Sequence, residues 1–128
     1  MTVAQKIASP VALKEEIKKQ IDVWIAKFPP DRKQSAVIPA LMIVQKNSGG
    51  WLTQGHMDAV AAYLEIPKIA VYEVASFYTM FDLEPVGKHK INVCTNISCM
   101  LCGSDQVMSH LKKRLGIGVG ETTTDGLF

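Results

Sequence analysis

The chain has 128 residues, of which 48% are apolar and 20% are charged, and its formal net charge is +2. This is the composition of an ordinary soluble globular domain, and it excludes a disordered segment. It also excludes a strongly basic nucleic-acid module, and no apolar run is long enough to span a bilayer. The opening segment MTVAQKIASP has no secretory apolar region and no Arg-rich presequence character, so we expect neither export nor a mitochondrial presequence.

Two helices are predicted for residues 10–46. The first follows Ser9 and Pro10, a typical N-cap residue and a proline at the first helical position. It carries one apolar stripe at helical spacing, made of Leu13, Ile17, Ile21, Trp24, Ile25 and Phe28. The second helix runs from about residue 32 to residue 46, and Pro39 inside it predicts a kink or a break. We expect Trp24 and Trp51 to anchor the core.

Two further helices follow the turn at residues 47–50 (NSGG). Thr53 is predicted to cap a helix that ends at Leu64, and His56 in its first turn is expected to be solvated or to take part in the cap. Pro67 is predicted to open a fourth helix that continues to about Phe81. Residues 1–82 are therefore expected to form a four-helix N-terminal domain.

The third and fourth predicted helices resemble a helix-turn-helix, which raises the question of DNA binding. The fourth predicted helix carries one cation, Lys68, and an acid, Glu73, whereas a DNA-reading helix needs several Arg, Lys, Asn or Gln side chains. We therefore expect no nucleic-acid partner. The density of aromatic residues in this segment suggests that Tyr78 packs on a partner protein or an adjoining domain.

The pattern changes after residue 82. Residues 83–87 (LEPVG) are predicted to be a linker, and residues 88–93 (KHKINV) alternate polar and apolar as a strand does. A helix is predicted over residues 104–115, and residues 122–128 resemble the entry to a second strand with a turn at Asp125 and Gly126. Pieces of about 40 residues rarely fold alone. Residues 88–128 are therefore expected to be the opening strand–loop–helix–strand of an α/β domain, with an α+β fold overall.

All three cysteines lie between these predicted elements, at Cys94, Cys99 and Cys102. A loop between a strand and a helix offers free backbone N–H groups that stabilise thiolates, which favours an iron–sulfur site. Three other interpretations stay open. Cys99 and Cys102 have the C-x-x-C spacing of a thiol-exchange pair, the three thiols with His89 or His110 match a zinc ligand set, and buried cysteines can act as small hydrophobes.

From SFYTMF through PVGKHKINVCTNISCMLCGSD, and on to LGIGVGETTTDGLF, the chain resembles the 24 kDa subunits of NADH:quinone oxidoreductase, respiratory complex I. The resemblance covers almost the whole chain and implies a helical domain joined to a thioredoxin-like [2Fe–2S] ferredoxin domain. It implies that Cys94 and Cys99 are cofactor-binding residues and ligands of the cluster iron. Cys102 has no counterpart among the family's ligands. The family's second cysteine pair would lie beyond Phe128, so the cluster is expected in the full-length protein and is expected to be absent or unstable in residues 1–128 alone.

The resemblance also implies a function. The family's subunit is part of an NADH dehydrogenase (quinone) and exchanges single electrons with the flavin of a flavin- and NADH-binding subunit, and it has no substrate site or catalytic residue of its own. It implies a place in the peripheral arm of a membrane complex, on the cytoplasmic face of a bacterial inner membrane or in the mitochondrial matrix. The sequence leaves two alternatives open: the equivalent subunit of an NAD(P)-linked hydrogenase or formate dehydrogenase, and a helical interaction module with a zinc or metal-free thiol site.

Overall fold

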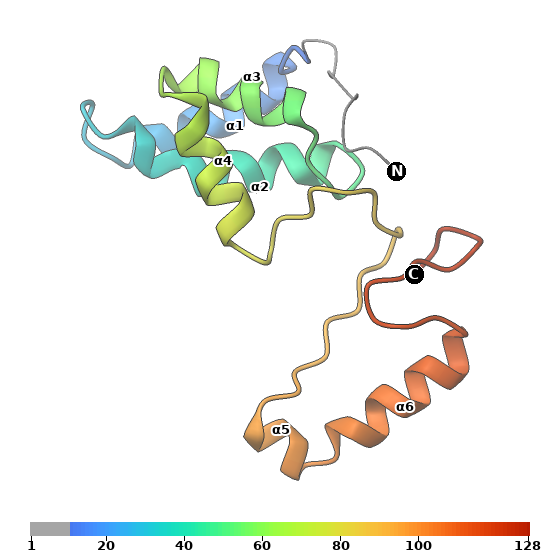
Figure 1. Ribbon diagram of the computed structural model, residues 1–128. Coiled ribbons are helices and arrows are strands. Elements are labelled where there is room, and N and C mark those ends of the chain that lie inside the picture. Colours follow the sequence, from blue (N-terminus) through green and yellow to red (C-terminus); the bar gives the residue numbers. More distant parts are fainter. Residues whose placement is uncertain (1–10) are drawn as a thin grey trace. The chain divides into compact units, whose positions relative to one another are not determined.

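The computed structural model describes residues 11–128, which fold into two compact units with their boundary between Pro85 and Val86 (Figure 1). The first unit contains α1 (Glu15–Ile25), the 3-10 helix η1 (Lys33–Ala36), α2 (Val37–Asn47), α3 (Gln54–Leu64) and α4 (Lys68–Phe77). The second unit contains α5 (Ile97–Leu101) and α6 (Ser104–Leu115). Within residues 11–128, no helix has both the length and the apolar character required to cross a membrane.

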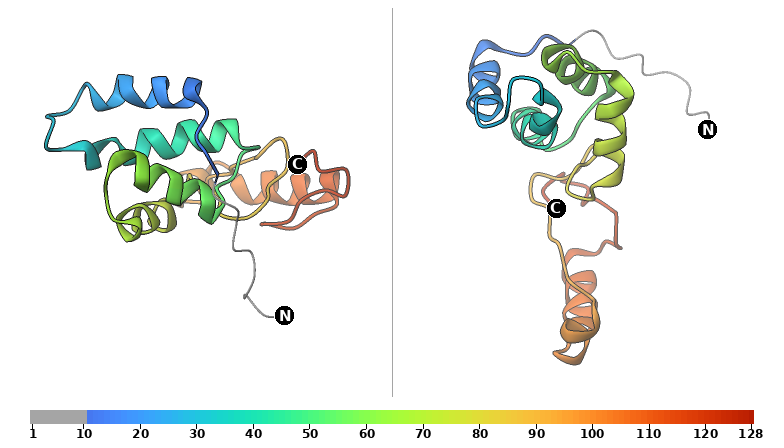
Figure 2. Two further views of the ribbon diagram at one scale, coloured as in Figure 1. Left: turned by 90° about the horizontal axis from the view of Figure 1, so that it is seen from above. Right: turned by 90° about the vertical axis from the view of Figure 1, so that its left-hand side faces the viewer.

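The first unit is a helical bundle with one apolar core. α1 packs against α2, and α3 packs against α4, and the views of Figure 2 show α1 and α2 lying side by side. Each helix buries one apolar stripe, as the sequence periodicity predicts. The largest fully buried side chains are those of Ile21, Val37, Leu41, Val44, Leu52, Val60, Leu64 and Val71.

The start of α3 confirms the predicted cap at Thr53. The Thr53 hydroxyl accepts a hydrogen bond from the His56 backbone N–H at 3.2 Å, and the Thr53 N–H donates to His56 Nδ1 at 3.1 Å. This is a capping box in which a histidine stands where Glu or Gln is usual. Burial lowers the pKa of His56, so its ring favours the neutral form that can accept this bond. The helix ends at Leu64, as predicted.

Two details of α1 differ from the sequence-based expectation. The predicted start at Ser9 and Pro10 lies outside the described residues, and the helix begins at Glu15. The prediction that Trp24 is a core anchor is wrong, because 39% of its surface is exposed. Ile21 already fills the contact with the neighbouring helices, and the Trp24 ring instead lies under the Lys27 ammonium, 3.8 Å from the ring centre.

The proline in the second predicted helix does not produce the break itself. The break comes earlier, where η1 gives way to α2 at Val37, and Pro39 is the third residue of α2. Backbone N–H groups in the first turn have no acceptor within the helix, so a proline there removes no hydrogen bond. The fourth helix is also shorter than predicted. α4 ends at Phe77, and Phe81 reaches the core from the chain that follows it.

The second unit lacks the predicted strands, since no residue in 11–128 adopts strand structure. The Lys88 and His89 N–H groups donate to the carbonyls of Gly126 and Leu127 at 3.0 and 2.7 Å. In a β-ladder only alternate residues bond to a given neighbour, so two consecutive donors do not begin a sheet. The strand predicted at residues 88–93 is therefore wrong: residues 88–89 form a bend, and residues 90–93 have no regular secondary structure.

The two ends of the second unit nevertheless lie against each other. A Cβ atom on Gly87 would lie 2.6 Å from the carbonyl carbon of Phe128, so only glycine fits at this position. The predicted turn at Asp125 and Gly126 is present, closed by the Gly126 N–H donating to the Thr123 carbonyl at 2.8 Å.

Helix α6 covers residues 104–115, as predicted, but it is not part of an apolar core. Its apolar residues Val107, Met108, Leu111 and Leu115 are half-buried or exposed. The one buried residue of the second unit is Ser104, at the start of α6. Apolar burial, the main stabilising term in folding, is therefore concentrated in the first unit.

We predict that Ile21→Ala destabilises the first unit by about 2–5 kcal/mol, because it leaves a cavity in a fully buried site. Val23→Ala is the matched control, since Val23 lies two residues away on the same helix and is 61% exposed. It is expected to change the free energy of unfolding by less than about 0.5 kcal/mol. Urea denaturation measures both values. Equal effects of the two variants would contradict the position of the core.

The second prediction concerns the proposed domains, a helical domain at residues 1–82 and an incomplete domain at residues 88–128. Amides in α1 to α4 are expected to exchange slowly with solvent, because they sit on the buried core. Amides from Lys88 onward are expected to exchange quickly. Hydrogen exchange followed by mass spectrometry makes this measurement. Uniform protection through Phe128 would show that residues 88–128 pack as a complete unit.

Candidate thiol site

The thiol segment is organised by a cap at Asn96. Residues 91–95 have no regular secondary structure. The Asn96 side-chain oxygen accepts a hydrogen bond from the Ile97 N–H at 2.8 Å, where α5 begins. Cys94 lies two residues before this cap, and Cys99 is the third residue of the helix. Asn is a preferred N-cap residue, so the sequence contains a signal for this short helix besides the spacing of the cysteines.

This turn brings the thiols of Cys94 and Cys99 into contact. The Asn96 backbone N–H hydrogen-bonds to the Cys94 sulfur, and the Cys99 thiol donates to the same sulfur. Both bonds favour a negative sulfur and lower the pKa of Cys94. The pKa of Cys99 is raised, because its thiol holds its proton toward Cys94. Cys94 is therefore the more acidic thiol of the pair.

Cys102 occupies a different position. It is the C-cap residue of α5, its backbone N–H donates to the Ser98 carbonyl at 3.2 Å, and its side chain is exposed. The hypothesis of buried cysteines is wrong, because Cys94 and Cys102 are exposed and Cys99 is partly exposed. The thiol-exchange hypothesis placed Cys99 and Cys102 at the start of a helix. Here they span its end, where the dipole does not stabilise a thiolate.

The predicted zinc ligands do not come together. Among residues 11–128, no three His, Cys, Asp or Glu side chains are placed to hold one metal ion. His89 lies instead beside the Phe128 ring, with 5.6 Å between ring centres. Of the three thiols and two histidines considered from the sequence, the structure joins only Cys94 and Cys99.

The chemistry of this pair fits one half of a [2Fe–2S] site. Such clusters are held by four cysteine thiolates, and each iron takes two of them. Two sulfurs in contact, both open to solvent, are suited to meet at one iron. The Asn96 N–H adds a hydrogen bond to the Cys94 sulfur, and hydrogen bonds to ligand sulfurs adjust cluster potentials. The pair thus has half the number of thiols that such a cluster takes.

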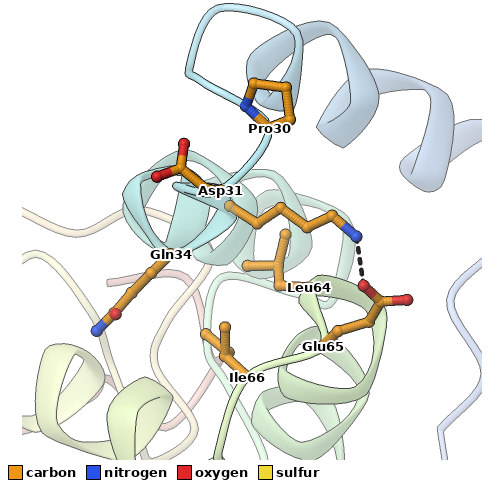
Figure 3. A pocket seen from close by; sticks show the side chains of 7 residues that line it. Pro30, Asp31, Gln34, Leu64, Glu65 and Ile66 are labelled. Carbon is orange, nitrogen blue, oxygen red and sulfur yellow. Dashed lines mark hydrogen bonds and ion pairs between the residues drawn. The ribbon is translucent and has the colours of Figure 1, made fainter.

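A hollow lies in the first unit, between η1 and the end of α3 (Figure 3). Lys33 and Glu65 form an ion pair across it, and Lys33 lowers the pKa of the Glu65 carboxyl. Glu65 is the C-cap of α3 and has a left-handed backbone, with φ of 57°. Asp31 also lines the hollow and pairs with Arg32. No group of metal-ligating side chains is found here among the described residues, and the charges of the hollow are paired, so it has the features of a structural contact between helices.

Comparisons with known proteins assign the chain to a family. The thioredoxin-like [2Fe-2S] ferredoxin family matches residues 21–128, and the chain belongs to this family. The E subunit of NADH-quinone oxidoreductase from Rickettsia bellii (strain RML369-C) is 49% identical over 104 residues, which are 81% of this chain and 62% of the relative. The E subunit of the same enzyme from Rickettsia prowazekii (strain Madrid E) is 48% identical over the same length, covering 81% and 59%.

A relative from another genus gives the same result. The E 2 subunit of NADH-quinone oxidoreductase from Rhizobium meliloti (strain 1021) is 46% identical over 112 residues, which are 88% of this chain and 65% of the relative. In each case the chain spans about three-fifths of the length of the curated relative.

Proposed function

We propose that this protein is an electron-transfer subunit of an NADH-quinone oxidoreductase. Its role is to exchange single electrons between the flavin of a partner subunit and a [2Fe–2S] cluster. The observation that carries the proposal is the contact between Cys94 and Cys99, within the region matched by the [2Fe-2S] family. The names of the relatives, all E subunits of this enzyme, support the choice of complex. The protein would contribute no substrate site of its own.

Cys94 and Cys99 are the proposed ligands in residues 1–128. When bound, a [2Fe–2S] cluster supplies one-electron redox chemistry. Cys94 would hold the iron as a thiolate, a form that the Asn96 N–H and the Cys99 thiol both favour. Cys99 would lose its proton on binding, because metal ligation requires both sulfurs deprotonated. After that step the Asn96 N–H still donates to Cys94 and steadies the ligand sulfur.

The remaining two ligands are proposed to come from residues outside 1–128, and the longer relatives support this arrangement. The same residues would add the strands that complete a thioredoxin-like sheet after residue 88. Residues 88–89 and 126–127 are already joined by two backbone hydrogen bonds, so the two ends of the unit lie together before such a sheet is completed. Residues 83–87 would act as the linker between the two domains.

The proposed partner is the flavin- and NADH-binding subunit of the same complex. The protein would sit in the peripheral arm, without inserting into the membrane, on the cytoplasmic face of a bacterial inner membrane or in the matrix of a mitochondrion. The identity of 46–49% with bacterial relatives favours the bacterial location.

Electron exchange with the partner is the direct test of the proposed function. The complete protein with its cluster is mixed with NADH, with or without the purified flavin subunit, and the reduced cluster is followed by electron paramagnetic resonance. The cluster signal is expected to appear quickly only when the flavin subunit is present, since this chain would have no NADH site. No reduction in the presence of the flavin subunit would refute the proposed function.

Cysteine variants of the complete protein test the ligand assignment. Cys94→Ser is expected to abolish or strongly change the visible spectrum, and Cys102→Ser is expected to leave it intact, because Cys102 lies at the other end of α5. Residues 1–128 alone, reconstituted with iron and sulfide, serve as a further control and are expected to hold less than about half a cluster, because they offer two of four thiolates. Loss of the spectrum in Cys102→Ser but not in Cys94→Ser would reverse the assignment.

A further inference from the structure

The segment that follows α4, residues 78–82, is held to the first unit by one side-chain amide. Gln45 lies in the last turn of α2, and the segment returns from the end of α4 toward that helix (Figure 1). Gln45 Nε2 donates a hydrogen bond to the Met80 carbonyl at 3.0 Å, and the Asp82 N–H donates to Gln45 Oε1 at 2.9 Å. We call this pair of bonds the Gln45 clamp.

A glutamine suits these two partners because its amide offers a donor and an acceptor from one group. The Met80 carbonyl needs a donor, and the Asp82 N–H needs an acceptor. The two bonds also fix the orientation of the amide, since the reversed amide would set its NH2 group against an N–H and its oxygen against a carbonyl. An ionised carboxylate at this position could satisfy only the Asp82 N–H.

Two further contacts hold the same segment. Phe81 lies between the two residues that the clamp binds, and it is only 6% exposed as part of the core of the first unit. The Asp82 carbonyl accepts a hydrogen bond from the N–H of Leu52, a fully buried residue, at 2.7 Å. Burial ends at the next position, because Leu83 is 41% exposed. The fixed part of the first unit therefore extends past the end of α4 as far as Asp82.

We propose that the Gln45 clamp sets where the linker between the two units begins, and so confines the mobile part of the connection to residues 83–87. Opening of the clamp, with release of Phe81 from the core, would add residues 78–82 to the linker and roughly double its length. The end-to-end distance of a flexible chain grows with the square root of its length, so the volume open to the second unit would rise about threefold. Gln45 thus limits the motion between the units, whether or not a cluster is bound.

Gln45→Met in the complete protein tests the clamp, because methionine keeps the length of the side chain and removes both hydrogen bonds. Hydrogen exchange is measured residue by residue by NMR. The Leu52 and Asp82 amides are expected to exchange at least about tenfold faster, since loss of two hydrogen bonds favours local opening. The Ile21 amide in α1 is expected to change by less than about twofold, because the core stays closed. Gln20→Met, at an exposed glutamine of α1, is the matched control and is expected to leave all three rates within about twofold.

The Leu52 amide is the decisive probe, because it bonds to Asp82 and not to Gln45. Faster exchange at Asp82 alone would show that the segment stays closed without the clamp. Equal acceleration at Leu52, Asp82 and Ile21 would show that Gln45 stabilises the whole unit. Either result overturns the proposal.

Thermal unfolding shows whether Gln45→Met keeps its fold, and Gln45→Glu, which removes only the donor to Met80, replaces it if it does not. The wild-type protein gives an independent measurement through its backbone order parameters. These are expected to stay near about 0.85 through Asp82 and to fall only from Leu83 onward. A fall that already begins at Tyr78 in the wild type would overturn the proposal without any variant.

Discussion

The turn at Asn96 is the constraint on which the thiol site depends. A chain that leaves an extended segment and enters a helix has several backbone N–H groups without partners. Asn96 satisfies one of them with its side chain, and its own N–H points to the Cys94 sulfur. Because α5 begins directly after Asn96, its first turn brings Cys99 back toward Cys94, five residues earlier in the chain. The C-x4-C spacing therefore works through a helix cap, and a longer or uncapped loop would not fix the two sulfurs together.

The two units obtain their order from different sources. The first unit buries Ile21, Leu41, Leu64 and other large apolar side chains completely, so packing determines where its helices lie. The second unit, Val86–Phe128, buries only Ser104. Its shape comes from local hydrogen bonds and turns, such as the Asn96 cap and the positive φ of the glycines that bound α6. Local bonds of this kind place neighbouring residues well but give little resistance to unfolding.

Local signals in the sequence predicted most of the helices correctly. α3 and α6 could be placed within a residue, because Thr53 and the glycines around residues 104–115 are strong boundary signals. The burial of Trp24 was predicted wrongly. The apolar stripe of α1 is wider than the surface that α1 buries against the core, and the stripe alone does not show which of its residues are buried. The structure has no strand at residues 88–93, where the sequence predicts one. Alternating polar and apolar residues form a strand only where a neighbouring strand pairs with them.

The site itself was predictable in part. The spacing of the three cysteines left several pairings open, and only the family resemblance implied Cys94 and Cys99. In the structure, the position of α5 separates these two from Cys102. Under the proposed function, the difference in stabilisation between the two units has a thermodynamic consequence. A unit without a buried apolar core has little folding energy of its own, so cluster binding and folding of the second unit would be coupled. The Asn96 turn would then lower the entropy lost on binding, since it already holds two of the four sulfurs in contact before the metal arrives.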